Sequence, residues 1–169
     1  MTKINKNLIL VGGGGFALEI YAYLIEEIRD QTITNISIKG VLDNSSNCEL
    51  LEKCPELSYL GDVDEYITQE NDFALITVGN AVLRHNIAKK LNQIHLPLHS
   101  YIHSSAFVST TAVIGLGVFI APHCVVSAHS NICDNVALNV YCGVGHGAKI
   151  NVHCVMSPYS VVNGDCELG

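Results

Sequence analysis

The sequence is poor in charged residues, which make up 15% of its 169 residues, whereas hydrophobic residues make up 49%. This composition excludes a disordered chain and predicts that much of the surface is buried, some of it between subunits. Basic residues are scarce too, with a net charge of -7 and no basic cluster longer than Lys89-Lys90. Because a nucleic-acid-binding face needs clustered positive charge, the sequence argues against nucleic acid as a partner.

Long hydrophobic runs are also absent. The longest uncharged apolar stretch, residues 112–121, contains glycines and is far shorter than the roughly 18 residues that a membrane span requires. The apolar residues 8–11 run into glycines and an acidic helix, and no signal-peptide cleavage site follows them. We therefore expect no membrane partner and a cytoplasmic location.

From residue 102 onward, an aliphatic side chain recurs at every sixth position. A second residue, usually a small one, follows each aliphatic residue four positions later. If six residues form one short strand and one turn, both sets point into a narrow prism, where a larger second residue would overpack the interior. Each buried aliphatic side chain contributes roughly 1.5–3 kcal/mol, and stacking of neighbouring coils makes the core continuous. The aliphatic positions are Ile102, Val108, Ile114, Ile120, Val126, Ile132, Leu138, Val144, Ile150, Met156, Val162 and Leu168.

The repeat also accounts for most of the cysteines. The seven cysteines are odd in number and show no C-x-x-C spacing, so neither a disulfide framework nor a zinc knuckle is indicated. Cys124, Cys142, Cys154 and Cys166 occupy the small interior position, where a free thiol behaves as a compact hydrophobic group. These four cysteines are therefore predicted to be structural, and the other three have no assigned role.

The first hundred residues have a different pattern, in which predicted strands alternate with predicted helices. Strands are expected at residues 8–11, 37–42 and 73–78, and helices at residues 16–29 and 81–91. Strand, helix and strand with a parallel crossover predict a small α/β unit that is Rossmann-like. We therefore expect two domains, residues 1–100 and residues 101–169.

Glycines follow the first predicted strand directly. Residues 12–17 fit the pattern G-x-G-x-x-A, in which glycines let backbone amides approach an anionic group at a helix N-terminus. Asp43 ends the second predicted strand, where its carboxylate can accept hydrogen bonds from a ribose. A domain of under a hundred residues suits a mononucleotide better than a dinucleotide. The alternative is a tight turn whose glycines only satisfy backbone geometry.

A Rossmann-like unit followed by a hexapeptide repeat resembles the bacterial sugar acetyltransferases of the NeuD/PglD type. These enzymes act in sialic-acid, bacillosamine and related surface-sugar pathways. The similarity extends through most of the chain and rests on residues 11–17, residues 78–80 with Arg84, residues 103–106 and residues 138–146. The resemblance implies a left-handed parallel β-helix. It also implies a homotrimer that transfers the acetyl group of acetyl-CoA to an amino or hydroxy sugar, with a UDP-linked amino sugar as the expected acceptor.

The resemblance also implies roles for particular residues. His146 would be the general base, because the nitrogen of an amino sugar must lose a proton as it attacks the thioester, and an imidazole suits this step. Gly164, one coil of eighteen residues later, would face acetyl-CoA. The UDP-sugar site would be lined by Gly14, Gly15, Phe16, Asp43, Asn44 and Gly79.

Four features depart from the family pattern. Gly147 stands where the family has an acidic residue that orients the catalytic histidine, and Val155 and Phe16 stand where it has histidines. The chain also ends at Gly169, before the coils that complete the acetyl-CoA cleft in the family, so its C-terminus is expected to be truncated. These departures leave a non-catalytic sugar-nucleotide-binding or scaffold protein as an alternative function.

Several other histidines lie in the repeat. A β-helical metal hydrolyase would gather three neutral imidazoles around zinc, but no spacing singles out a triad, and no metal is expected. His123, Tyr141 and Tyr159 are spaced by eighteen and are predicted to stack along one edge, as surface packing or a trimer contact. His129 is expected close to His146, as a proton relay or as a solvated pair.

Overall fold

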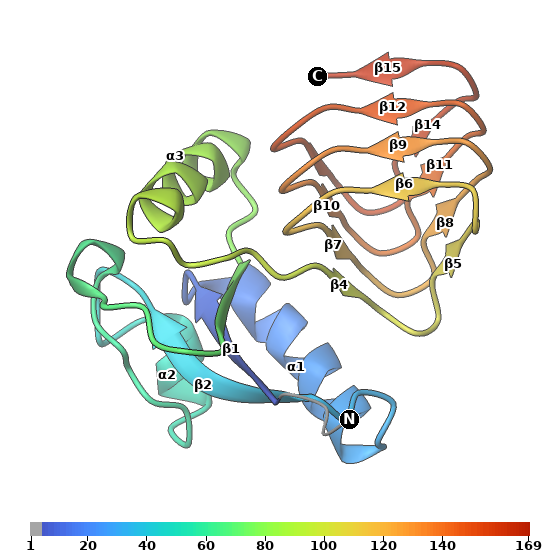
Figure 1. The fold of residues 1–169 in the computed structure, drawn as a ribbon. Coiled ribbons are helices and arrows are strands. Elements are labelled where there is room, and N and C mark those ends of the chain that lie inside the picture. The colour runs from blue at the N-terminus through green and yellow to red at the C-terminus, as the bar shows by residue number, and fades with distance from the viewer. Residues whose placement is uncertain (1–4) are drawn as a thin grey trace. The chain divides into compact units, whose positions relative to one another are not determined.

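The computed structural model describes residues 5–169, so the first four residues of the expected domain 1–100 lie outside the described part. The chain divides into two compact units: residues through Val78 together with Asn86–His99, and Gly79–His85 together with Ser100–Gly169. Helix α3 (Ala81–Gln93) begins in the second unit and continues in the first. Figure 1 shows the α/β elements of the first unit and the stacked coils of the second.

A three-stranded parallel sheet forms the centre of the first unit, in the order β2-β1-β3. Its elements are β1 (Lys6–Val11), α1 (Gly15–Arg29), β2 (Ile36–Leu42), α2 (Glu49–Lys53), the 3-10 helix η1 (Val63–Glu65) and β3 (Asp72–Ile76). The sequence predicted the three strands and the helices α1 and α3, and it missed the short helices α2 and η1. Strand β3 ends two residues earlier than predicted, where Thr77 donates its backbone N–H and its hydroxyl to the carbonyl of Val11.

Strand β1 is apolar along most of its length because it lies at the centre of this sheet. Leu8, Ile9 and Leu10 are fully buried, as is typical of a parallel strand that is covered on both faces. Helix α1 buries Ile20 and Leu24, which the helical spacing of the sequence predicted to face the core. These contacts fix the carboxyl end of β1 and the start of α1, where the glycine run lies.

A partly buried histidine makes the stability of the first unit depend on pH. The ring of His99 packs edge-on against Phe73, and burial together with the nearby Lys6 ammonium lowers the pKa of His99 from 6.5 to about 4. Between these values the unfolded chain binds a proton that the folded chain does not, so the free energy of unfolding should fall as the pH falls from 6.5 toward 4. His99→Gln should remove this part of the dependence, and melting curves at about pH 7.5 and about pH 5 measure it. If His99→Gln lost as much stability between these two pH values as the parent does, the pH dependence could not be assigned to His99.

Short parallel strands make up the second unit, and they stack into three sheets. Their bounds are β4 (Tyr101–Ile102), β5 (Phe107–Val108), β6 (Val113–Ile114), β7 (Phe119–Ile120), β8 (Val125–Val126), β9 (Asn131–Ile132), β10 (Ala137–Leu138), β11 (Gly143–Val144), β12 (Lys149–Ile150), β13 (Val155–Met156), β14 (Val161–Val162) and β15 (Glu167–Leu168). The sheets have the orders β13-β10-β7-β4, β14-β11-β8-β5 and β15-β12-β9-β6. Each strand therefore pairs with the strand one coil away, as Leu138 does with Met156. This arrangement fits the predicted left-handed β-helix (Figure 1).

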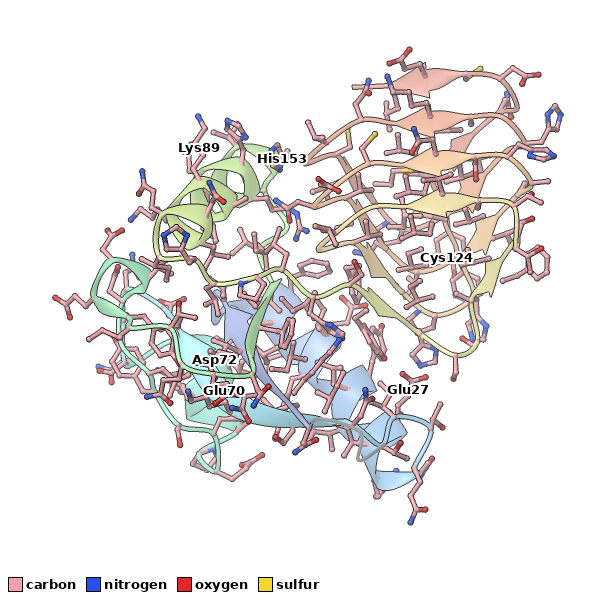
Figure 2. The ribbon with its side chains drawn as sticks, viewed as in Figure 1. Glu27, Glu70, Asp72, Lys89, Cys124 and His153 are labelled. Carbon is pink, nitrogen blue, oxygen red and sulfur yellow. The ribbon has the colours of Figure 1, made fainter. Side chains whose placement is uncertain are left out.

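The sixfold aliphatic positions point into the interior of the coils, as predicted. From Ile120 to Met156 these side chains are at most 3% exposed, whereas Ile102 and Leu168 in the end coils are 39% and 38% exposed. The small positions follow the same trend. Cys124, which Figure 2 labels, is fully buried, and its thiol donates to the carbonyl of Asn139 at 3.0 Å. The prediction of a structural role is thus supported for the inner cysteines, while the last one, Cys166, is exposed.

From Gly117 to Asp165, each turn of the β-helix contains one residue with left-handed backbone geometry. These residues form three columns, spaced by eighteen: His123, Tyr141 and Tyr159; His129, Gly147 and Asp165; and Gly117, Asn135 and His153. In the first column the rings of His123 and Tyr141 stack at 5.0 Å, and those of Tyr141 and Tyr159 at 4.9 Å. The predicted aromatic ladder is therefore confirmed.

A buried arginine attaches the segment Gly79–His85 to the β-helix. Arg84 is fully buried, and its guanidinium donates to the side-chain oxygen of Asn135 at 2.7 Å. Asn135 in turn donates to the carbonyl of Arg84 and contacts Nδ1 of His153 at 2.9 Å. Burial lowers the pKa of Arg84 to about 10, so the guanidinium stays charged at neutral pH. Arg84 therefore stabilises the second unit. Figure 2 shows His153 beside the start of α3, where the ring of His153 contacts that of His85.

Candidate functional site

His146 lies in the turn that follows β11, with 73% of its side chain exposed. Gly164 occupies the equivalent place in the next coil, and a Cβ atom built on Gly164 would come within 2.7 Å of Nε2 and Cε1 of the imidazole. The ring therefore lies directly over a position that has no side chain. The two residues that the resemblance assigned to catalysis and to acetyl-CoA are thus neighbours in space.

A carboxylate that the sequence reasoning missed also lies beside His146. Oδ2 of Asp165 is 3.7 Å from Nδ1 of His146, and the backbone N–H of Asp165 donates to the carbonyl of His146 at 2.8 Å. Asp165 occupies the same place as Gly147 in the next coil. Gly147 is the position where the resemblance leads us to expect an acidic residue. Adding eighteen to the number of Gly147 gives this aspartate, so the repeat itself contained the signal.

A shallow pocket of about 210 Å³ lies next to His146 on the outer face of the sheet that contains β8, β11 and β14. Its lining residues are Val125, Ser127, Gly143, Val144, Gly145, Val161, Val162, Asn163 and Gly164. Gly143 stands between Val125 and Val161 in adjacent coils, and its missing side chain leaves the hollow. The volume is below the range of about 300–1,000 Å³ that is typical of pockets for drug-sized ligands, so this hollow alone is too small to enclose such a ligand.

The remaining predicted site residues of the first unit gather at the carboxyl edge of its sheet. The glycine run follows β1, and Asp43 and Asn44 follow β2. Because β2 and β3 lie on opposite sides of β1, the chain reverses its direction of winding next to β1. In open parallel sheets, ligands bind in the crevice at such a point. Gly79, in contrast, belongs to the second unit.

The N-terminus of α1 is accessible at the glycine run. Gly14 is the N-cap of the helix, and a Cβ atom built on Gly14 would meet no other atom within 4 Å. Asp43 holds the loop from the other side, because its Oδ2 accepts from the backbone N–H of Gly13 at 2.8 Å and its Oδ1 from Ser45 at 3.0 Å. Each carboxylate oxygen retains a second lone pair that a ribose hydroxyl can use.

Helix α2 brings a second acidic group to the same loop. The backbone N–H of Leu50 donates to the carbonyl of Gly13 at 2.8 Å, and Oε2 of Glu49 lies 3.5 Å from the place of a Cβ atom on Gly15. A carboxylate near the amino end of α1 interacts favourably with the helix dipole and repels a phosphate. An anionic ligand at this loop must therefore move Glu49 or present an uncharged part to it.

Two glycines of this loop should respond differently to the same substitution. Gly12 has a φ of 103°, and a Cβ atom there would clash with the side chain of Val78. Gly12→Ala should therefore lower the free energy of unfolding by about 1–3 kcal/mol. Gly14→Ala has room for its methyl group and should leave stability within about 1 kcal/mol of the parent while weakening ligand binding at the loop. Chemical denaturation measures the stability of both variants, and nucleotide-sugar titration measures their ligand binding. Equal destabilisation of the two variants would contradict the different roles assigned to Gly12 and Gly14.

Neither a metal-binding cluster nor a membrane-spanning helix is found among the described residues. Within residues 5–169, no group of three or more histidine, cysteine, aspartate or glutamate side chains is placed to hold a metal ion. His123, His129 and His153 belong to three different columns of turns, which separates them around the β-helix. No helix in the described part of the chain is long and apolar enough to cross a membrane.

Comparison with known proteins supports the fold. No protein-family model and no curated protein matches the chain. Among solved structures, WeeI from Acinetobacter baumannii AYE has a TM-score of 0.77 at 15% identity, covering 96% of this chain and 74% of that one. The acetyltransferase domain of PglB from Neisseria gonorrhoeae FA1090 has a TM-score of 0.60 at 20% identity, covering 96% and 88%.

A third solved structure was determined with ligands. Perosamine N-acetyltransferase PerB from Caulobacter crescentus, in complex with CoA and GDP-perosamine, has a TM-score of 0.58 at 20% identity. The match covers 95% of this chain and 84% of that one. The chain therefore has the fold of hexapeptide-repeat, left-handed β-helix sugar acetyltransferases.

Proposed function

We propose that this protein is an acetyl-CoA-dependent acetyltransferase that acts on an amino or hydroxy sugar, with His146 as the general base. One observation carries the proposal: an exposed imidazole lies over Gly164 and beside a small pocket, in a fold that sugar acetyltransferases share. One such protein binds CoA together with a nucleotide-linked amino sugar. The bacterial sialic-acid-like and bacillosamine-like pathways are the setting that the sequence resemblance suggests.

The reaction needs one proton acceptor at the point of attack. The neutral amine or the hydroxyl of the sugar attacks the thioester carbonyl, and a C–N or C–O bond forms. Nε2 of His146 takes the proton that the nucleophile sheds. The C–S bond then breaks, and the thiolate of CoA leaves and takes the proton of the imidazolium. Transfer thus regenerates neutral His146 and requires no metal ion.

The pocket beside His146 suits the acetyl thioester end of the donor. Its lining is mostly glycine and valine, which matches the apolar acetyl and methylene groups, and Ser127 and Asn163 add polar atoms. The rest of CoA must lie along the exposed face of the same sheet. Phe107, Val125 and Val161 are exposed on that face, and we propose that a neighbouring subunit of a homotrimer covers it and completes the site.

The first unit would bind the nucleotide part of the acceptor, as a small Rossmann-like domain within residues 1–100. The accessible N-terminus of α1 and the carboxylate of Asp43 lie at the winding reversal of the sheet, where nucleotides bind in such folds. Gly14, Gly15 and Phe16 would face the ligand, with Asn44 beside Asp43. A UDP-linked sugar is the acceptor that we propose first.

A thioester-consumption assay against a panel of acceptors tests this function. The panel contains UDP-linked amino sugars, a GDP-linked amino sugar and sialic-acid-like acceptors, each with acetyl-CoA. We expect free thiol to appear with one of them and mass spectrometry to show one added acetyl group on the sugar. Binding of a UDP-sugar without any turnover by the assembled protein would instead favour the non-catalytic binding or scaffold function.

A further inference from the structure

We infer that Asp165 is a positioning residue for His146, and that it provides from the next coil the carboxylate that Gly147 does not provide. Asp165 lies nineteen residues from His146, with its carboxylate 3.7 Å from Nδ1 and its backbone bonded to the carbonyl of His146. Two independent contacts therefore join these residues across one step of the β-helix. The inference rests on the proposed function for its catalytic consequence.

Two glycines make room for this pair. A Cβ atom on Gly147, where φ is 65°, would clash with Oδ1 of Asp165. A Cβ atom on Gly164 would crowd the imidazole of His146 on its Nε2 side. The absence of both side chains leaves space for the ring over Gly164 and for the carboxylate on the Nδ1 side of the ring. The glycine at 147 is thus part of the arrangement rather than only a lost acidic residue.

The position of the carboxylate determines which ring nitrogen acts as the base. A carboxylate on the Nδ1 side favours the neutral tautomer that carries its proton on Nδ1, which leaves the lone pair on Nε2. Nε2 and Cε1 are the ring atoms nearest to the Cβ position of Gly164, and Gly164 lines the pocket proposed for the thioester. The reactive nitrogen therefore lies on the substrate side of the ring.

Solvent limits the strength of this contact. The two side chains are 73% and 78% exposed, and 3.7 Å is an ion-pair separation rather than a direct hydrogen bond. Catalytic contacts of this kind are often long without substrate and shorten in the complex. The carboxylate therefore acts on the orientation and tautomer of the ring, and its removal should affect turnover and leave folding unchanged.

The test compares Asp165→Asn with Glu167→Gln in the full chain. Both variants remove one exposed carboxylate from the last coil, but Glu167 lies in β15, in a different sheet from β11, and pairs with Lys149 at 2.8 Å. The ¹⁵N spectrum of the His146 ring should show less of the Nδ1–H tautomer in Asp165→Asn and no change in Glu167→Gln. The kcat for acetyl transfer should fall about tenfold in Asp165→Asn, with each KM within about twofold of the parent.

A relocated carboxylate provides the matching rescue. The double variant Asp165→Gly with Gly147→Asp moves the acidic group to the coil of His146, and both positions have the left-handed geometry that Asp and Gly tolerate. We expect the Nδ1–H tautomer and part of the kcat to return. An unchanged tautomer in Asp165→Asn would overturn the inference whether or not the protein transfers acetyl groups. A changed tautomer without any activity in the parent would retain the contact and refute the proposed function instead.

Discussion

Replacing His146 by alanine should lower kcat/KM for acetyl transfer by at least about 100-fold, because general-base catalysis contributes about 10²–10⁴ to such reactions. The side chain is mostly exposed and contacts Gly164 and Asp165, so its loss should leave the thermal midpoint nearly unchanged. The measurement is initial-rate thioester consumption with the best acceptor of the panel. Undiminished activity of His146→Ala would remove the imidazole from the mechanism.

A neighbouring histidine serves as the matched control for this experiment. His129 lies in the same column as Gly147 and Asp165, in the preceding coil, and has a φ of 58°. His129→Asn keeps a residue that tolerates this geometry and should retain the parent rate if the two imidazoles are only a solvated pair. A loss comparable to that of His146→Ala would instead show a proton relay between them.

The largest expected effect on stability comes from the interior of the β-helix. Leu138 is fully buried in a middle coil, and Leu138→Ala should lower the free energy of unfolding of this unit by about 2–5 kcal/mol. Leu168 occupies the same position of the repeat in the last coil but is 38% exposed, so Leu168→Ala should cost about 1 kcal/mol or less. Urea unfolding followed by circular dichroism measures both.

The comparison of two leucines isolates burial from residue type. Both variants remove the same three carbon atoms from the same place in a hexad, and only the cover from neighbouring coils differs. Equal losses would mean that the interior is not one continuous core. A larger loss for Leu168 would mean that the end coil has cover that the described chain does not supply.

The sequence was sufficient to predict the β-helix because each six-residue period corresponds to one strand and one turn of the coil. The same side-chain requirement returns every six residues, so Ile120 and Leu138 could be assigned to the interior without any knowledge of contacts. Cys142 could be interpreted in the same way, as a packing residue with a buried thiol. Local spacing likewise predicted α1 and the strands of the first unit.

Features that depend on contacts between distant segments could not be read in this way. The five-residue helix α2 is too short to show a helical period, so the approach of Glu49 to the glycine run was missed. The attachment of Arg84 to Asn135 joins residues 51 apart, and no spacing marks it. Asp165 could have been found, since it is one coil from Gly147. It required asking whether the carboxylate that is missing at position 147 is provided by the equivalent position of the next coil.

The equivalence of the coils restricts how the length of this half of the protein can vary. Removing eighteen residues would delete one complete circuit and return every later side chain to its original edge. Removing six residues between His146 and Gly164 would turn everything beyond the cut by one face, which would carry Gly164 and Asp165 away from His146 while keeping the aliphatic residues inside. An insertion or deletion of six residues therefore preserves the core alone. One of eighteen residues preserves both the core and the alignment of the edges.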